Sequence, residues 1–331
     1  MACSAIRCLA AKHGEESTTL IVKSELAGLA RREFPRSPVI ALPWRRRKKG
    51  KNQAAANIRS CFPAWRILLR TKADQMVCLR SQRNYLQTLF FASPKAGGRF
   101  APENTLLLNG KWRRIFTERL LRIFKKPILV PYPDPSAERP SEVEAHRRVL
   151  TAALDREVRV EEVTPHLRSA SWRGGGSWLF CPFSSRGSKD YDARLWAEAL
   201  RSSVPPPLIR LAGGHDQAAR LEEFAATLRS EGVACPIEIV PPQPLETFPD
   251  LVAECGLVLT VDTSAAHFAC ALGAPAVIVH CGLHEGVYGP YSPNGRQIWL
   301  MGDYGRLGHK RWRESVPPQM VADAIKRALA A

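Results

Sequence analysis

The chain has 331 residues, 45% of them hydrophobic, which suits a folded protein of two domains and excludes a largely disordered one. Its net charge of +17 is confined to one half: residues 1–160 hold 32 Lys and Arg against 13 Asp and Glu, whereas residues 161–331 hold 16 against 18. No stretch reaches the roughly 18 apolar residues of a membrane-spanning helix. Residues 1–14 lack the apolar core of a signal peptide.

Nine cysteines are scattered along the chain, and several of them fall inside apolar strand or helix patterns. An odd, scattered set indicates reduced thiols in a cytosolic protein rather than a disulfide framework. No C-x-x-C pair suggests structural zinc. We therefore expect a cytoplasmic protein.

Two basic segments account for much of the charge in the first half. Residues 45–51 are almost all Arg and Lys, and residues 111–126 interleave basic with apolar side chains, as in a basic amphipathic helix. This charge has three interpretations: a solvated loop, docking to an anionic lipid surface or acceptor, and nucleic-acid binding. No nucleic-acid-binding pattern accompanies the charge, so we expect no nucleic acid as a partner. The solvated loop and an anionic membrane surface both remain open, and the membrane surface is the partner we favour.

A proline-rich segment, residues 127–140, separates the two halves, because such a segment makes a poor helix or strand interior. A helix is predicted over residues 141–154. Three glycines at 174–176 form a flexible break before the second half.

The second half alternates short apolar runs with helical segments. Strands are predicted over residues 177–183, 207–212, 235–240 and 257–261, and helices over residues 193–202, 216–231, 245–255 and 317–330. This alternation predicts an α/β domain with a parallel sheet covered by helices on both faces.

Residues 256–279 contain the most informative pattern: a strand, a polar turn, a short helix and a second strand. The pattern places Asp262, Thr263, Ser264 and His267 at the carboxyl end of a strand, where parallel α/β sheets bind ligands. A helix that begins there offers unpaired backbone N–H groups to a phosphate. Alternatively, Thr263 or Ser264 is only an N-cap and His267 only a surface residue.

Two other strand ends carry polar residues that suit a phosphorylated ligand. Ser184, Ser185 and Lys189 follow the first predicted strand and resemble a phosphate cradle, although a polar loop that caps the next helix is the alternative. Gly214 and Asp216 follow the second strand, where a glycine permits a close approach to a ligand and Asp216 could instead cap a helix.

Two groups of residues admit a metal interpretation that we do not favour. Asp190 and Asp192 form a D-x-D pair, but acidic residues are common at helix starts. His280, Cys281 and His284 lack a clear fourth ligand. We therefore expect no metal site.

The second half resembles a known family. Asp262-Thr263-Ser264-x-x-His267, then Ala271-Leu272-Gly273-Ala274-Pro275 and Gly289-Pro290-Tyr291, is similar to the donor-site signature of family 9 glycosyltransferases, the ADP-heptose:lipopolysaccharide heptosyltransferases and their relatives. The resemblance is strong over about residues 177–300 and collinear across the first half. It implies a GT-B-like α/β fold of two Rossmann-like domains facing a cleft. We expect a basic acceptor-side domain over 1–160, a nucleotide-sugar-binding domain over 170–316 and a terminal helix over 317–331.

The resemblance also implies an activity: metal-independent, inverting transfer of a sugar, heptose in the named relatives, from a nucleotide-diphosphate donor such as ADP-heptose. The acceptor would be a lipid-linked or phosphorylated saccharide of the lipopolysaccharide core, at the inner face of the inner membrane. No cofactor beyond the substrate is implied. The donor-binding residues would be Ser184, Ser185, Lys189, Gly214, Asp216 (to the ribose), Asp262, Thr263, Ser264 and His267. Candidates on the acceptor side are Arg80, Gln82 and His146.

The first residues depart from the family pattern. Family members begin with an apolar strand and a Gly-Asp turn, whose Asp is the usual candidate for the catalytic base. Here Ala5–His13 resembles the helix after that turn and Thr18–Lys23 the second strand, so the first strand is missing and no base is assigned. Either the recorded start lies downstream of the true one, or the protein is a degenerate member that binds nucleotide sugar or lipid saccharide without transfer. A related nucleotide-sugar enzyme, such as an epimerase, is a third reading.

Overall fold

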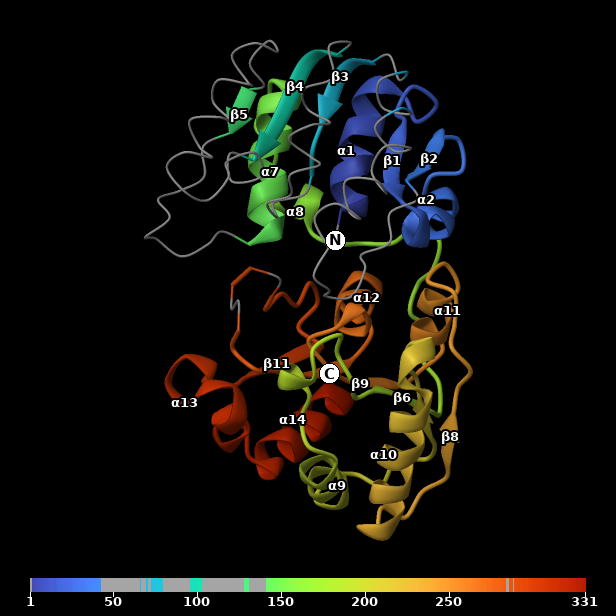
Figure 1. Ribbon diagram of the computed structural model, residues 1–331, viewed down its shortest axis with the longest axis vertical. Coiled ribbons are helices and arrows are strands. Elements are labelled where there is room, and N and C mark those ends of the chain that lie inside the picture. The colour runs from blue at the N-terminus through green and yellow to red at the C-terminus, as the bar shows by residue number, and fades with distance from the viewer. Residues whose placement is uncertain are drawn as a thin grey trace, which may run out of the picture. The chain divides into compact units, whose positions relative to one another are not determined.

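The computed structural model describes residues 2–42, 66, 70, 73–79, 96–102, 128–130, 141–283, 286–287 and 289–331. The chain divides into two compact units, Met1–Thr164 and Pro165–Ala331 (Figure 1).

The second unit is built on one six-stranded parallel sheet in the order β11-β10-β9-β6-β7-β8. Its strands are β6 (Trp178–Cys181), β7 (Ile209–Leu211), β8 (Ile237–Ile239), β9 (Leu257–Val261), β10 (Ala276–His280) and β11 (Gln297–Met301). Its α-helices are α9 (Ala193–Arg201), α10 (Ala218–Ser230), α11 (Phe248–Ala253), α12 (Ser264–Leu272), α13 (Tyr304–Arg311) and α14 (Pro318–Ala330). Short 3-10 turns cover η2 (Gly187–Lys189), η3 (His215–Gln217) and η4 (Trp312–Ser315).

The sheet of the second unit is covered on both faces, as the near-continuous apolar strands require. Helices α9, α10 and α14 contribute to one core with alternate residues of β6, β7, β9 and β10, while α11 packs on α12 and α12 on β9 and β10. Phe180 lies at the centre of the first core, with its ring centroid 4.8 Å from that of Trp196 and 5.1 Å from that of Phe224. This arrangement confirms the doubly covered parallel sheet.

The elements predicted for the second unit all occur; strand β9 has the predicted bounds, whereas β6, β7 and β8 are shorter than predicted. For example, the strand predicted over 177–183 is limited to Trp178–Cys181. Strand β11 and helix α13 were not predicted. Helix α14 packs against α9, β10 and β11 within the second unit.

The described strands of the first unit form two parallel sheets (Figure 1). One pairs β1 (Leu20–Lys23) with β2 (Val39–Leu42), and the other has the order β3 (Ala73–Val77), β4 (Ala96–Pro102), β5 (Ile128–Val130). Its described helical elements are α1 (Cys3–His13), η1 (Ser24–Leu26), α2 (Ala27–Glu33), α7 (Glu142–Leu154) and α8 (Val160–Val163).

Helix α1 packs on α7 and α8 through a small apolar cluster in which Ala5 and Leu9 meet Leu150 and Leu154. Helix α7 begins one residue after the predicted start, and Ser141 caps it by accepting the N–H of Glu144. The helix and strand expected over 5–13 and 18–23 correspond to α1 and β1. Both basic segments, residues 45–51 and 111–126, lie outside the described residues.

None of the helices in the described part of the chain is both long and apolar enough to cross a membrane.

Candidate functional site

The strand order of the second unit creates one switch point. From β6 the chain runs outward through β7 to β8, then returns to the other side of β6 at β9 and continues through β10 to β11. Strands β6 and β9 are therefore neighbours, with Cys181 paired to Thr260, while the segments that follow them run to opposite sides (Figure 1). Ligands of open parallel sheets bind outside the carboxyl ends of strands at such a point.

The segment after β6 folds into a tight turn held by its own polar groups. Buried Ser184 donates its hydroxyl to the Arg186 carbonyl and accepts the Arg186 N–H, while its own N–H donates to Asp190 at 2.7 Å. Asp190 also pairs with Arg220 at 2.7 Å. The Ser184 hydroxyl thus shapes the turn, whereas Ser185 is exposed beside it.

Lys189 joins this turn to the segment after β9. Its Nζ donates a short hydrogen bond to Oδ2 of Asp262, the first residue after β9. Both side chains are largely buried, the lysine 14% and the aspartate 5% exposed. The structure therefore brings together two of the predicted donor-site residues that are 73 positions apart in the sequence.

A second side chain, the imidazole of His280, also approaches Asp262. His280, the last residue of β10, places its Nε2 3.6 Å from Asp262 Oδ2. Burial raises the pKa of Asp262, but the hydrogen bond and charge of Lys189 outweigh burial and leave the pKa below its usual value. The carboxylate is thus negatively charged at neutral pH.

Helix α12 begins directly after this carboxylate. Thr263 is its N-cap and accepts the Ala265 N–H at 3.2 Å, while its hydroxyl lies 3.0 Å from that of Thr260. Ser264 is exposed in the first turn. Gly273 ends the helix in the left-handed conformation, φ 70°. The predicted helix and its N-cap are confirmed, and the positive end of the helix lies next to Asp262 and Lys189 in the sheet.

His267 lies one turn along α12 and contacts the segment that contains the Gly-Pro-Tyr motif. Its Nδ1 is 2.6 Å from the Tyr291 hydroxyl, and the two rings are stacked at an interplanar angle of 9°. Burial lowers the pKa of His267 to about 4, so its imidazole is neutral at pH 7. A Cβ at Gly289 would lie 2.6 Å from the Trp299 ring, which explains why a glycine precedes Pro290.

The segment after β7 is tied to the segment after β6 by a residue that the sequence did not single out. Gln217 accepts the Gly214 N–H at 2.9 Å and donates to the Ser184 carbonyl at 3.4 Å. Gly214 and Asp216 are both exposed. Only the position of Gln217, three residues after Gly214 at a predicted helix start, could have suggested this role.

The acceptor-side candidates belong to the first unit. Arg80 and Gln82 lie outside the described residues. His146, on α7, is 2% exposed and donates from Nε2 to the Leu79 carbonyl, just after β3, at 2.6 Å. Burial lowers its pKa to about 4, and its Nδ1 has no hydrogen-bond partner in the described part of the chain.

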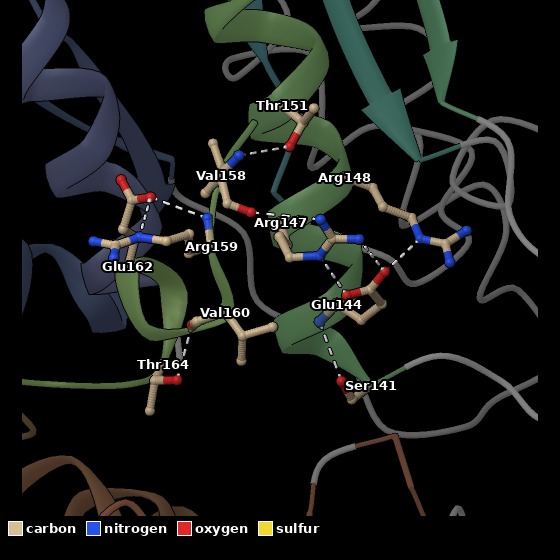
Figure 2. Close-up of polar contacts among 10 residues, drawn as sticks. All are labelled: Ser141, Glu144, Arg147, Arg148, Thr151, Val158, Arg159, Val160, Glu162 and Thr164. Atoms are coloured by element: carbon tan, nitrogen blue, oxygen red, sulfur yellow. Dashed lines mark hydrogen bonds and ion pairs between the residues drawn. The ribbon is translucent and has the colours of Figure 1, made fainter. Parts of the chain in front are cut away.

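Helix α7 also carries paired arginines next to His146. Figure 2 shows Arg147 and Arg148 both directed at Glu144, with the closest nitrogen–oxygen distances 2.7 and 2.6 Å. The Arg147 guanidinium lowers the pKa of Glu144, assisted by Arg148. One carboxylate thus holds two cations, and this face of α7 keeps one net positive charge.

The acidic residues that admitted a metal interpretation have structural roles instead. Asp192 is the N-cap of α9, and Asp190 is occupied by Ser184 and Arg220. His284 lies outside the described residues. In the parts of the chain that are described, no three His, Cys, Asp or Glu side chains are placed to hold a metal ion together.

Comparisons with known proteins agree with this architecture. Residues 118–311 match glycosyltransferase family 9 (heptosyltransferase). Among solved structures, Escherichia coli heptosyltransferase WaaC with ADP is 17% identical, with a TM-score of 0.66 over 99% of this chain and 96% of that one. E. coli ADP-heptose LPS heptosyltransferase II is 16% identical, with a TM-score of 0.60 over 100% and 94%.

A family 9 glycosyltransferase from Veillonella parvula is 13% identical, with a TM-score of 0.64 over 94% and 88%. A search of curated protein sequences found no significant match. These likenesses establish an α/β fold of the GT-B type. With more than half of its length matched, the chain belongs to glycosyltransferase family 9.

Proposed function

We propose that this chain transfers a sugar from a nucleotide-diphosphate donor, and that the diphosphate binds where β6 and β9 end. The observation that carries the proposal is the buried Lys189–Asp262 pair beside the start of α12. A lysine and a helix N-terminus together form a site for phosphate oxygens. A switch point of a parallel sheet is where such a site is expected.

The chemistry follows from the charge of the donor. Negative charge develops on the diphosphate as the glycosyl bond breaks, and Lys189 with the first N–H groups of α12 would stabilise it in the transition state. Ser185 and Ser264, both exposed beside these groups, are candidates to bind phosphate oxygens. Ser184 would act indirectly, since its hydroxyl holds the turn that carries Lys189.

The remaining donor residues would bind the nucleoside and sugar. Gly214 and Asp216 would contact the ribose, with Gln217 fixing the distance between their segment and the phosphate-binding turn. Asp262, Thr263 and His267 would orient the donor. An ADP-sugar is the favoured donor, because the similar WaaC structure was solved with ADP and another with ADP-2-deoxy-2-fluoro heptose.

The acceptor would be a lipid-linked or phosphorylated saccharide of the lipopolysaccharide-core type, attacked with inversion and without a metal ion. Arg80, Gln82 and His146 remain its candidate contacts, and the catalytic base is unassigned. The charge of the first half supports a peripheral location at an anionic cytoplasmic membrane face. Reversing the charges of residues 45–49 should lower co-sedimentation with phosphatidylglycerol vesicles; unchanged sedimentation would remove the membrane as a partner.

The test of the function is an incubation with ADP-heptose and a lipid-linked core acceptor, read by mass spectrometry of the acceptor. We expect wild type and the control Lys326→Ala, which alters an exposed lysine of α14, to add one heptose. Lys189→Ala should lose this activity. Donor binding without transfer by wild type would instead favour the alternative, a non-catalytic nucleotide-sugar or lipid-saccharide binding protein. Failure to bind any ADP-, GDP- or UDP-sugar would contradict the proposal.

A further inference from the structure

Asp262 lies between two partners of different chemistry. One oxygen, Oδ2, accepts from the Lys189 ammonium and also lies 3.6 Å from Nε2 of His280. The His280 side chain is 1% exposed and sits at the end of β10, next to β9 in the sheet. Its position in the fold is thus fixed by the same sheet that fixes Asp262.

The backbone determines which ring nitrogen of His280 carries the proton. The Gly282 N–H donates to His280 Nδ1 at 2.9 Å, so Nδ1 acts as an acceptor and bears no hydrogen. The neutral imidazole must then carry its proton on Nε2, the nitrogen that faces Asp262. His280 can therefore donate toward the carboxylate without becoming charged.

The residues around Gly282 leave little freedom for this arrangement to change. Gly282 has φ +89°, and a Cβ there would lie 2.0 Å from the Gly302 carbonyl oxygen. The Gly302 N–H in turn donates to the His280 carbonyl at 2.7 Å. The Gly282 N–H that orients the His280 ring is therefore held in place by the backbone that follows β11.

If the proposed function holds, the Asp262 carboxylate and the donor diphosphate compete for the Lys189 ammonium. Without donor its ammonium is paired with Asp262, whereas a donor diphosphate would draw it away from the carboxylate. A buried carboxylate that loses its cation is strongly destabilised unless another hydrogen-bond donor replaces the cation. His280 Nε2 is the group already directed at the same oxygen.

We propose that His280 is a positioning residue that holds Asp262 in place when Lys189 turns to the donor diphosphate. The inference rests on the proposed function. In the structure the 3.6 Å separation is longer than a hydrogen bond, and it would close by about 0.6 Å when the lysine leaves. The Asp262 carboxylate would then stay away from the phosphates and keep its orientation toward the donor.

A matched pair of variants distinguishes the roles of the two ring nitrogens of His280. The amide nitrogen of His280→Gln can take the place of Nε2 and still donate to Asp262, whereas the shorter His280→Asn can replace only the Nδ1 contact with Gly282. Calorimetric titration with ADP should show affinity within about twofold of wild type for His280→Gln and a loss of about tenfold for His280→Asn. Melting temperatures of both variants establish that they are folded.

Equal ADP affinity in wild type and His280→Asn, or an equal loss in both variants, would overturn the inference while leaving the proposed function intact. Absence of ADP binding by wild type would overturn both. A measurement on the wild-type protein does not depend on whether the variants fold. The ¹⁵N spectrum of His280 should show an unprotonated Nδ1 and a protonated Nε2. The Nε2–H resonance should shift when the protein is saturated with ADP. An Nε2–H resonance that does not move would contradict the proposal.

Discussion

Each of the two units holds a buried histidine whose Nε2 lies 3.6 Å from a carboxylate oxygen: His280 with Asp262 in the second unit and His146 with Glu142 in the first. The two histidines differ in their other ring nitrogen. Nδ1 of His280 accepts a backbone N–H, whereas Nδ1 of His146 has no partner in the described residues. Within the described residues, both ring nitrogens of His280 therefore face polar groups, whereas only one ring nitrogen of His146 does.

The strand connections explain this difference. His280 ends an interior strand of the sheet, so backbone groups after β11 and in the turn after β10 both contact it. His146 lies on helix α7, and among the described residues its ring is hydrogen-bonded to the Leu79 carbonyl, just after β3. A histidine at a strand end inside a sheet is therefore held from several directions, whereas a helical one depends on the segments that pass over it.

A substitution that disturbs the backbone contact of His280 should have the largest effect on the free energy of unfolding. Gly282→Ala would force a Cβ against the Gly302 carbonyl at a positive φ and should lower the free energy of unfolding by about 3 kcal/mol. Gly286→Ala is the matched control, because Gly286 also has positive φ (+77°) but no atom of the described residues lies within 4 Å of the added Cβ. It should cost only about 1 kcal/mol. Urea unfolding measures both; equal losses would show that the contact with Gly302 is unimportant.

Acidification should reveal the neutral histidine of the first unit. The pKa of His146 is about 4 in the folded protein, against about 6.5 when unfolded, so the unfolded state binds the proton first as the pH falls. The contribution of the neutral His146 side chain to the free energy of unfolding is fully present above pH 6.5 and is lost between pH 6.5 and 4. Lowering the pH from 7.5 to 5 should therefore reduce the free energy of unfolding by about 2 kcal/mol, because His146 is protonated in the unfolded state and neutral in the folded state.

His146→Gln keeps a donor for the Leu79 carbonyl but cannot titrate in this range. Urea unfolding at both pH values should therefore show a smaller pH effect in this variant, by about 2 kcal/mol. His267, whose pKa burial also lowers to about 4, contributes equally to both proteins. An identical pH dependence in wild type and variant would mean that His146 is protonated in the folded state.

Local patterns were sufficient to predict much of the second unit. The apolar run, Asp-Thr-Ser turn and Gly-Ala-Pro stop predicted β9, α12 with its Thr263 N-cap, and β10, since each depends on a few neighbouring residues. Strand β11 was not predicted, because its apolar run of four residues, Ile298–Met301, is too short for its pattern alone to identify a strand. Its place in the sheet comes from pairing with β10.

The polar network could be predicted only in part. Convergence of Lys189 on Asp262 was expected from the carboxyl ends of neighbouring strands, but their direct pairing depends on β9 returning beside β6. The Ser184 hydroxyl was expected to face a phosphate and instead closes its own turn. His280 was considered only as a metal ligand, because its tautomer depends on the Gly282 N–H, which no residue pattern indicates.

The central claim is that Lys189 and the start of α12 bind the diphosphate of a nucleotide sugar. It is tested most directly by calorimetric affinities of ADP and AMP for wild type and Lys189→Ala, because AMP supplies the same base and ribose without the second phosphate. We predict that wild type prefers ADP by at least about tenfold and that the variant binds the two nucleotides almost equally. A preference for ADP that survives unchanged in Lys189→Ala would contradict the account.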